Sequence, residues 1–131
     1  MRNPLINKIK QLAQQEQNLD VLWLYGSRAK GNASQASDYD LAVAFKSFPE
    51  DKWQQRILPE SLAIDWAEKL GVDANLVSVV DINHIPIQLA MSVIEHGEAL
   101  IVKDSLRLAR EENRITSMWE VDHQYHREHY G

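Results

Sequence analysis

Residues 26–43 read GSRAKGNASQASDYDLAV, and the two ends of this stretch decide how the chain folds. A Gly-Ser pair directly follows the apolar run VLWLY, and the acidic tripeptide DYD leads into the apolar run LAVAF. Short apolar runs bounded by turn-forming residues are typical of buried β-strands. We therefore expect two strands whose ends carry small and acidic residues, joined by a polar loop.

Strands and helices alternate along the rest of the chain. We expect strands at residues 21–25, 40–45, 72–80 and 99–102, and helices at residues 4–17, 51–70, 86–96 and from 104 onward. The expected helices carry apolar residues at helical spacing, and prolines or glycines mark several of their ends. This order predicts a single α/β (α+β) domain over residues 1–131, with its sheet covered by helices. The order alone leaves open whether the sheet is parallel or mixed.

The composition is that of an ordinary globular protein, with 44% hydrophobic and 25% charged residues. The net charge of −5 argues against a free-standing nucleic-acid binder, which usually carries a basic stripe. The absence of cysteine excludes disulfides and thiolate metal sites. The polar N-terminal residues and the lack of a long apolar run predict a cytoplasmic protein without a signal peptide or a membrane partner.

Asp38 and Asp40 are the first candidate site residues. Alternate residues of a strand point to the same face, so the two carboxylates are expected to lie side by side. Two such carboxylates repel each other unless a cation lies between them. Mg²⁺ is the cation that this donor set favours, because it prefers hard oxygen ligands and is usually held by one or two carboxylates plus substrate phosphates.

Gly26 and Ser27 form the second candidate element. A glycine at the end of a strand lets the backbone approach a ligand closely. If Ser27 opens a helical turn, its hydroxyl and the free backbone N–H groups nearby suit phosphate oxygens. The two ends of the loop together predict a site for phosphoryl or nucleotidyl transfer. Arg28 and Lys30 are nearby cations that either contact the phosphates or are solvated loop charges.

This pattern resembles the signature of the DNA polymerase β-like nucleotidyltransferase superfamily, Gly-Ser followed by Asp-x-Asp. Here residues 28–37 separate Gly-Ser from Asp38-Tyr39-Asp40. The flanking sequences GSRAKG and SDYDLAV, and the later stretch VSVVDINHIPIQLAMSVIEHGEAL, are similar to those of the minimal nucleotidyltransferases (MNT). The resemblance covers residues 19–103 and implies a mixed sheet of about four strands flanked by helices.

The resemblance also implies a role for each matching residue. Gly26 and Ser27, with Arg28 as a tentative addition, would bind the phosphates of ATP, the implied substrate. Asp38 and Asp40 would be catalytic and would bind the Mg²⁺ cofactor. These roles are carried over position by position from the superfamily motif.

The third carboxylate of the superfamily has no clear counterpart in this chain. An ungapped match places Ser78 at its position, and counting from Gly71 places Asn75 there instead. Asp73 is the tentative third metal ligand, and Asp81 is a second candidate. The remaining alternative is that the third carboxylate is absent, in which case the proton of the attacking hydroxyl passes to another base or to water.

The minimal nucleotidyltransferases that this chain resembles are typically antitoxins paired with a HEPN-domain ribonuclease toxin. The resemblance implies a type VII-like antitoxin that transfers AMP from ATP to a tyrosine hydroxyl of its cognate HEPN toxin, in a hetero-oligomer. One alternative is a non-catalytic antitoxin that sequesters the toxin by binding. Another is a small-molecule or tRNA nucleotidyltransferase, against which the short chain and acidic charge both argue.

Residues 118–131, MWEVDHQYHREHYG, form an aromatic and histidine-containing tail. His123, His126 and His129 recur at every third residue, which would make them near neighbours on a helix. We interpret the tail as a partner-docking segment, with a frayed end and a metal site as the alternatives.

Overall fold

The computed structural model describes residues 3–31 and 37–130; the side chains of His126, His129 and Tyr130, which belong to the predicted tail, lie outside the described residues. The helices are α1 (Pro4–Gln15), α2 (Gly26–Lys30), α3 (Lys52–Leu70), the 3₁₀ helix η1 (Ala74–Leu76), α4 (Ile87–His96) and α5 (Ser105–Tyr130). The strands are β1 (Leu19–Tyr25), β2 (Tyr39–Phe45), β3 (Val77–Asp81) and β4 (Glu98–Val102). No helix among the described residues combines the length and the apolar composition that crossing a membrane requires.

The four strands form one mixed sheet in the order β3-β2-β1-β4. Strand β1 is antiparallel to both β2 and β4, and β2 is parallel to β3. This confirms the expected mixed sheet of four strands flanked by helices. The parallel connection is made through α3, because parallel neighbours need a long crossover.

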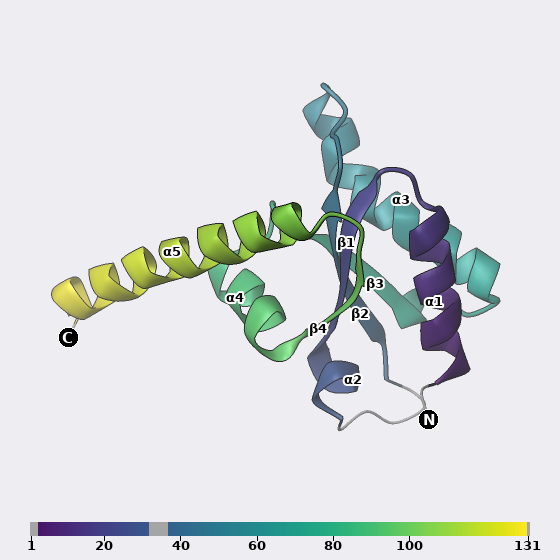
Figure 1. Ribbon diagram of the computed structural model, residues 1–131, viewed down its shortest axis with the longest axis horizontal. Helices are drawn as coiled ribbons and strands as arrows, with labels where there is room; N and C mark the ends of the chain where they lie inside the picture. The colour runs from purple at the N-terminus through teal and green to yellow at the C-terminus, as the bar shows by residue number, and fades with distance from the viewer. Residues whose placement is uncertain (1–2, 32–36, 131) are drawn as a thin grey trace.

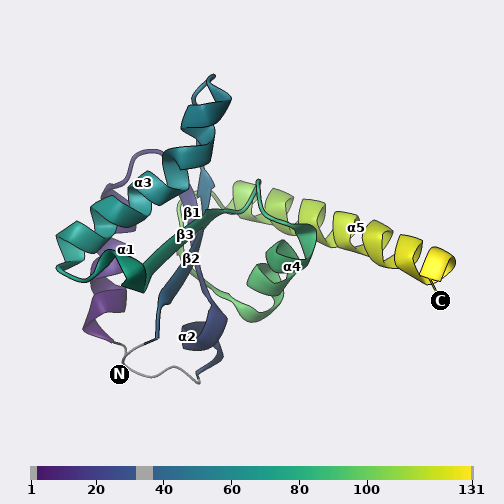
Figure 2. The same cartoon turned by 180° about the vertical axis from the view of Figure 1, so that it is seen from behind.

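Helices cover both faces of the sheet, α1 and α3 on one and α4 and α5 on the other (Figures 1 and 2). Strand β2 shows why the two faces differ. Leu41, Val43 and Phe45 point into the core under α1 and α3, whereas Ala42 and Ala44 point toward α4 and α5. The small alanines leave room on that second face for larger side chains from the neighbouring elements, among them Trp23, Ile82, Val93 and Ile115.

Strand β3 begins at Val77 and not at residue 72, so the sequence-based prediction of its start was wrong. Residues 74–76 form η1, and the Asp73 side chain caps this turn by accepting a 2.9 Å hydrogen bond from the Asn75 N–H. Aspartate favours such local side-chain to backbone bonds over a strand ladder. The four residues before Val77 therefore lie outside the sheet.

Helix α3 contains Pro59, which has no N–H to donate and therefore interrupts the helical hydrogen bonds. The ribbon changes direction along α3, and its first turns project beyond the edge of the sheet (Figure 1). The helix ends at Gly71, whose φ of 71° is the left-handed conformation that closes many helices.

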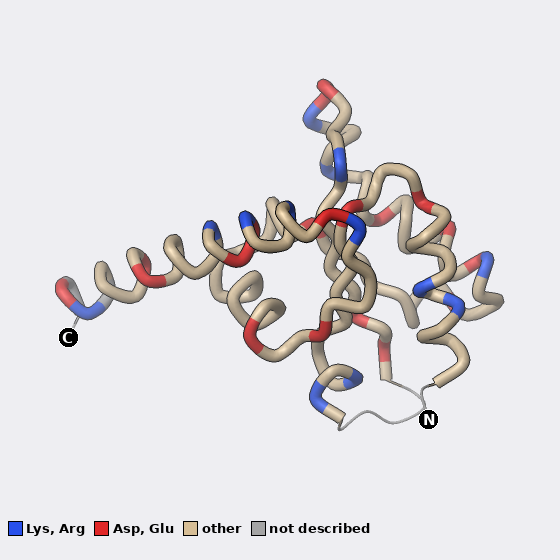
Figure 3. Tube along the Cα trace, viewed as in Figure 1, with Lys and Arg blue, Asp and Glu red and all other residues tan. Residues whose placement is uncertain are grey.

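Helix α5 is 26 residues long, so the predicted final helix and tail form one continuous element. Its first half packs on the sheet and its second half extends away from the rest of the fold (Figure 1). Among the described residues, Lys and Arg are spread over several helices, and they form no basic stripe along α5 (Figure 3).

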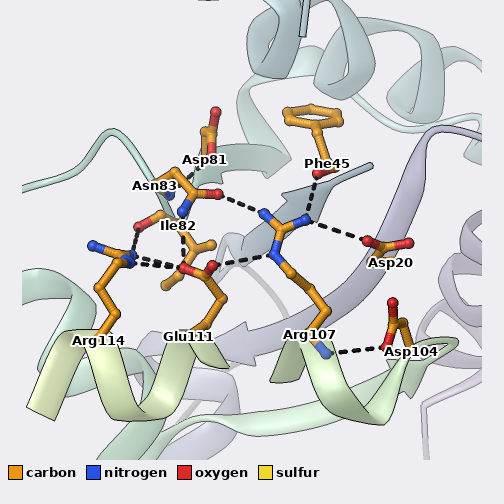
Figure 4. A network of polar contacts seen from close by, with 9 residues as sticks. All are labelled: Asp20, Phe45, Asp81, Ile82, Asn83, Asp104, Arg107, Glu111 and Arg114. Atoms are coloured by element: carbon orange, nitrogen blue, oxygen red, sulfur yellow. Dashed lines mark hydrogen bonds and ion pairs between the residues drawn. The ribbon is translucent and has the colours of Figure 1, made fainter. Parts of the chain in front are cut away.

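Buried polar groups fasten the first half of α5 to the sheet (Figure 4). The Arg107 guanidinium donates to Asp20 at 3.2 Å, to the Phe45 carbonyl at 2.9 Å and to the Asn83 side chain at 2.7 Å. Glu111 is 6% exposed and lies between two guanidinium groups, 3.1 Å from Arg107 and 2.8 Å from Arg114. The network joins α5 to the start of β1 and to the ends of β2 and β3.

Candidate active site

The candidate site lies at the opposite end of the sheet from this network. Asp40, the second residue of β2, is paired with Tyr25 at the end of β1 and with Ser78 near the start of β3. Residues paired across a sheet share one face, so the Asp40 side chain is flanked by Tyr25 and Ser78. Asp38 precedes the strand by one residue and is exposed.

Gly26 brings the other end of the loop against Asp40. Its φ of 70° is a left-handed conformation that glycine adopts without steric cost. A Cβ added at this position would overlap the Asp40 carboxylate, meeting Oδ2 first and lying 3.2 Å from Cγ. The backbone of the Gly-Ser pair therefore lies directly beside the Asp40 carboxylate. Residues 26–30 form α2, which confirms the expected helical turn after Gly26.

Burial and charge repulsion act together on the site. Burial raises the pKa of the Asp40 carboxyl, and the nearby Asp38 carboxylate raises it further. The pKa of Tyr25 is raised by burial and by the negative charge of Asp40. Among the described residues, no hydrogen bond or ion pair reaches the side-chain carboxylate of Asp38 or of Asp40. Within residues 3–31 and 37–130, the site thus concentrates negative charge without a compensating partner.

This donor set fits Mg²⁺. Hard carboxylate oxygens that lie close together and lack a cationic partner are the environment that the ion requires. Across residues 3–31 and 37–130, however, no three carboxylates or histidines gather into a complete set of metal ligands. A metal at Asp38 and Asp40 would therefore take its remaining ligands from substrate phosphates and water.

Arg28 connects the two ends of the loop. Its guanidinium donates to the Ser37 carbonyl from Nη2 at 2.7 Å and from Nε at 3.2 Å. The same group stacks on the ring of Tyr39, 3.8 Å from the centroid. The Tyr39 hydroxyl in turn accepts a 2.6 Å hydrogen bond from Asn3, the N-cap residue of α1. These contacts hold the backbone on both sides of Asp38.

The structure separates the candidates for a third carboxylate. Asp73 caps η1 and is exposed, outside the strand that runs beside Asp40. Asp81 is paired with Val43, so it lies on the other face of the sheet from Asp40. There its buried carboxylate accepts a 2.9 Å hydrogen bond from the Asn83 N–H and contacts His84 at 2.7 Å. Ser78 is the β3 residue that directly neighbours Asp40.

Tyr25 is the neighbour that sequence reasoning missed. It ends the apolar run VLWLY and was interpreted only as part of a buried strand. Its position beside Asp40 follows from the pairing of β1 with β2, which no local pattern in the sequence specifies. The one available signal is its place directly before Gly26, since a polar aromatic at the end of an apolar strand borders the loop.

Comparisons with known proteins agree with this geometry. The family described as "Polymerase beta, Nucleotidyltransferase" matches residues 7–106. No curated protein matches the chain. A solved toxin–antitoxin structure with AMP-PNP is similar at 23% identity and a TM-score of 0.75, over 93% of this chain and 92% of that chain.

Two further solved structures are similar to this chain. One is the toxin–antitoxin MntA–HepT, at 22% identity and a TM-score of 0.68, over 94% of this chain and 91% of that chain. The other is a tri-AMPylated HEPN toxin from Shewanella oneidensis in complex with an MNT antitoxin. It matches at 21% identity and a TM-score of 0.69, over 94% of this chain and 90% of that chain.

At these identities the solved structures establish the fold, and the family match establishes descent. The matched region includes the Gly-Ser pair, the Asp-x-Asp pair and all four strands of the sheet. This chain therefore belongs to the polymerase beta nucleotidyltransferase family.

Proposed function

We propose that this chain is a cytoplasmic antitoxin that transfers AMP from ATP to a tyrosine hydroxyl of a HEPN ribonuclease toxin. The observation that carries the proposal is the carboxylate pair: Asp40 lies against the backbone of Gly26, Asp38 lies near Asp40, and neither has a cationic partner among the described residues. The similar structures supply the choice of partner, since they are toxin–antitoxin complexes and one contains an AMPylated HEPN toxin.

The residues of the site would share the work as follows. Asp38 and Asp40 would hold Mg²⁺, which supplies neutralisation of the triphosphate charge when it is bound. Gly26, which lacks a Cβ, lets the Asp40 carboxylate lie against the loop backbone, and the Gly26 and Ser27 backbone and the Ser27 hydroxyl would bind the phosphates. Arg28 would keep Asp38 in place through the Ser37 carbonyl, a role that the observed contacts favour over direct phosphate binding.

In the proposed reaction, the tyrosine oxygen attacks the α-phosphorus of ATP and a new P–O bond forms. The bond between the α-phosphorus and the bridging oxygen breaks, and pyrophosphate leaves with that electron pair. The tyrosine proton passes to water, because the β3 neighbour of Asp40 is Ser78 and not a carboxylate. Tyrosine, with an ordinary pKa near 10, loses its proton more easily than an aliphatic hydroxyl does.

The same position also supports a second candidate, a non-catalytic antitoxin that inactivates the toxin by binding. A site that lacks the third carboxylate has lost its general base, and a loss of that kind typically lowers the rate by a factor of about 10²–10⁴. The fold would then serve as a binding module.

Intact-mass measurement of the toxin distinguishes the two candidates. The HEPN protein encoded beside this chain is incubated with the chain, ATP and Mg²⁺, and then weighed. We expect mass increments of one AMP residue, which disappear with the Asp38→Asn/Asp40→Asn variant. The matched control, Glu68→Gln/Glu112→Gln, removes the same charge at exposed positions of α3 and α5 outside the site and should retain the increments.

An unmodified toxin that nevertheless forms a stable complex and loses its ribonuclease activity would refute nucleotide transfer. That result would establish the binding antitoxin instead.

A further inference from the structure

Strand β3 is an edge of the sheet. Its partner is β2, and no other strand among the described residues pairs with its far side. The Ile82 N–H donates to the Val43 carbonyl at 2.9 Å, so Ile82 and, by alternation, Val80 face β2. The backbone N–H and C=O groups of Val79 and Asp81 therefore point away from the sheet.

A groove runs along this edge, between β3 and α3. One part has a volume of about 530 Å³ and is lined by Lys52, Gln55, Arg56, Pro59, Val79, Val80, Asp81, His84 and Ile85. The adjoining part has a volume of about 480 Å³ and is lined by Arg56, Pro59, Glu60, Ala63, Ala74, Asn75, Val77, Ser78 and Val79. Arg56, Pro59 and Val79 line both parts, so the two parts lie side by side along the edge.

The identity of the lining residues shows what kind of surface this groove is. Consecutive residues of β3 line each part, and consecutive strand residues point to opposite faces. The groove therefore follows the backbone edge of β3 and not one face of the sheet. Pro59 and Ala63 of α3 form an apolar wall opposite that edge. An occupant of the groove would meet unpaired backbone groups on one side and an apolar surface on the other.

One end of the groove is cationic. Lys52 and Arg56 are exposed and have no ion-pair or hydrogen-bond partner for their side chains within residues 3–31 and 37–130. Asp81 also lines this end, but its carboxylate is buried and already accepts from the Asn83 N–H and contacts His84. Two unpartnered cations on a chain with a net charge of −5 favour an acidic occupant.

We propose that this β3–α3 groove binds an extended, acidic segment of a partner protein, which adds to β3 as a further strand. Backbone hydrogen bonds to Val79 and Asp81 would give affinity, and acidic side chains at the Lys52 and Arg56 end would set direction and selectivity. A second copy paired through its own β3 edge would bring the same Lys52 and Arg56 to the interface and not the acidic strand that these cations favour.

The groove also adjoins the candidate active site. Its lining includes Ser78, the β3 neighbour of Asp40. A strand added to β3 would lie two strand spacings, about 10 Å, from β2. A bound segment would thus run from the cationic end toward the carboxylate pair. The binding proposal itself goes beyond the proposed function and holds whether or not nucleotide transfer takes place.

A selection from a phage-displayed library of random peptides tests the proposal. The complete wild-type chain is the target, without ATP or metal, and the enriched peptides are synthesised with a fluorescent label. We expect enrichment of Asp and Glu among β-branched residues. Binding should slow amide hydrogen exchange at Val79 and Asp81. Fluorescence polarisation should show binding that is weaker by about tenfold or more for Lys52→Glu/Arg56→Glu, as two desolvated charge contacts would give.

The matched control is Lys8→Glu/Arg110→Glu, which makes the same charge change at exposed positions of α1 and α5. It should bind the peptides within twofold of wild type. The selection and the binding assays contain neither ATP nor metal, so their result does not depend on the proposed nucleotide transfer. Circular dichroism verifies that each variant is folded. If Lys52→Glu/Arg56→Glu does not fold, the single substitution Arg56→Gln replaces it in the binding assay.

Three results would overturn the proposal. One is that no acidic peptides are enriched. Another is that the enriched peptides bind the reversed variant as tightly as wild type, or protect amides outside β3. The third is that inorganic phosphate or a nucleotide displaces them competitively at the cationic end, which would identify a phosphate site instead.

Discussion

At the scale of single residues, ionised Asp40 lowers the stability of the fold, and the same carboxylate is the proposed metal ligand. Its carboxylate is partly buried beside a second carboxylate, and both effects raise its pKa. The folded protein therefore holds the Asp40 proton more tightly than the unfolded chain does. The contribution of Asp40 to stability is greatest at acid pH and is lost as the pH rises through its folded-state pKa.

The substitution Asp40→Asn should therefore stabilise the metal-free protein at neutral pH. Since Asp40 is partly solvated, solvent screening limits the gain to a rise in Tm on the order of 1 °C. The gain should shrink as the pH falls below the pKa of Asp40, because wild type is then protonated too. Adding Mg²⁺ should raise the Tm of wild type and leave that of the variant unchanged.

Thermal unfolding at several pH values, with and without Mg²⁺, checks this prediction. Glu120→Gln, an exposed carboxylate on α5, is the control for loss of one negative charge. A lower Tm for Asp40→Asn at neutral pH would contradict the prediction, because it would mean that the folded state stabilises the ionised carboxylate.

The sequence identified the two ends of the loop because the motif fixes residue types at fixed spacing. It did not identify the neighbours of Asp40, Tyr25 and Ser78, as a set. Those neighbours depend on how β1 and β3 align with β2, and alignment between strands is a tertiary property. The sequence likewise left the contacts of Arg28 open, because a cation in a loop can face solvent or bind phosphate. In the structure, its guanidinium donates to the Ser37 carbonyl.

At the scale of secondary-structure elements, the attachment of α5 depends on few groups. Glu111 lies between Arg107 and Arg114 and also accepts a 2.8 Å hydrogen bond from Asn83. Removing the buried Glu111 charge would leave the positive charges of both guanidinium groups without their shared carboxylate partner. The helix is thus held by a polar network as well as by apolar contacts such as those of Ile115.

We predict that Glu111→Gln lowers the free energy of unfolding by about 1–3 kcal/mol, the cost of an imperfectly satisfied buried polar group. Urea denaturation followed by circular dichroism provides the measurement. The neighbouring Glu112 is exposed, and Glu112→Gln should change stability by less than about 0.5 kcal/mol. Equal effects of the two substitutions would mean that the network contributes nothing beyond surface charge.

Element boundaries were predictable where local chemistry decides them. Gly26 and Gly71 adopt the positive φ that their positions require. Strand β1 ends directly before Gly26 and helix α3 ends directly before Gly71, as expected. The start of β3 was not predictable from apolar character, because Val72 belongs to the same apolar pattern as Val77. The capping bond of Asp73 decides between turn and strand, and it overrides that pattern.

At the scale of the whole molecule, the extended half of α5 is an appendage of the folded domain. Three large apolar residues of this half are about half exposed or more: Met118 at 50%, Val121 at 68% and Tyr125 at 49%. Together with Ile87 of α4 they border an apolar groove of about 480 Å³. This half of α5 extends away from the sheet (Figure 1), and the docking role of residues 118–131 stays a prediction.

Deleting residues 118–131 should therefore leave the domain folded. Ile115, the last buried side chain among those described in α5, is retained, so we expect the free energy of unfolding to fall by less than about 1.5 kcal/mol. If the segment docks a partner, the truncated chain should bind the HEPN protein at least about tenfold more weakly, measured by calorimetry. Unchanged affinity would contradict the docking role, and loss of the fold would contradict the description of an appendage.

The strand order has a consequence for synthesis on the ribosome. Strand β1 (residues 19–25) lies inside the sheet, between β2 and β4. Its neighbour β4 (residues 98–102) is synthesised about 75 residues later. While the chain is being translated, β1 pairs with β2 but has an open, strongly apolar edge until β4 emerges. Nascent chains at that stage are the form most exposed to aggregation and to chaperones, because an unpaired apolar strand edge invites pairing with other chains.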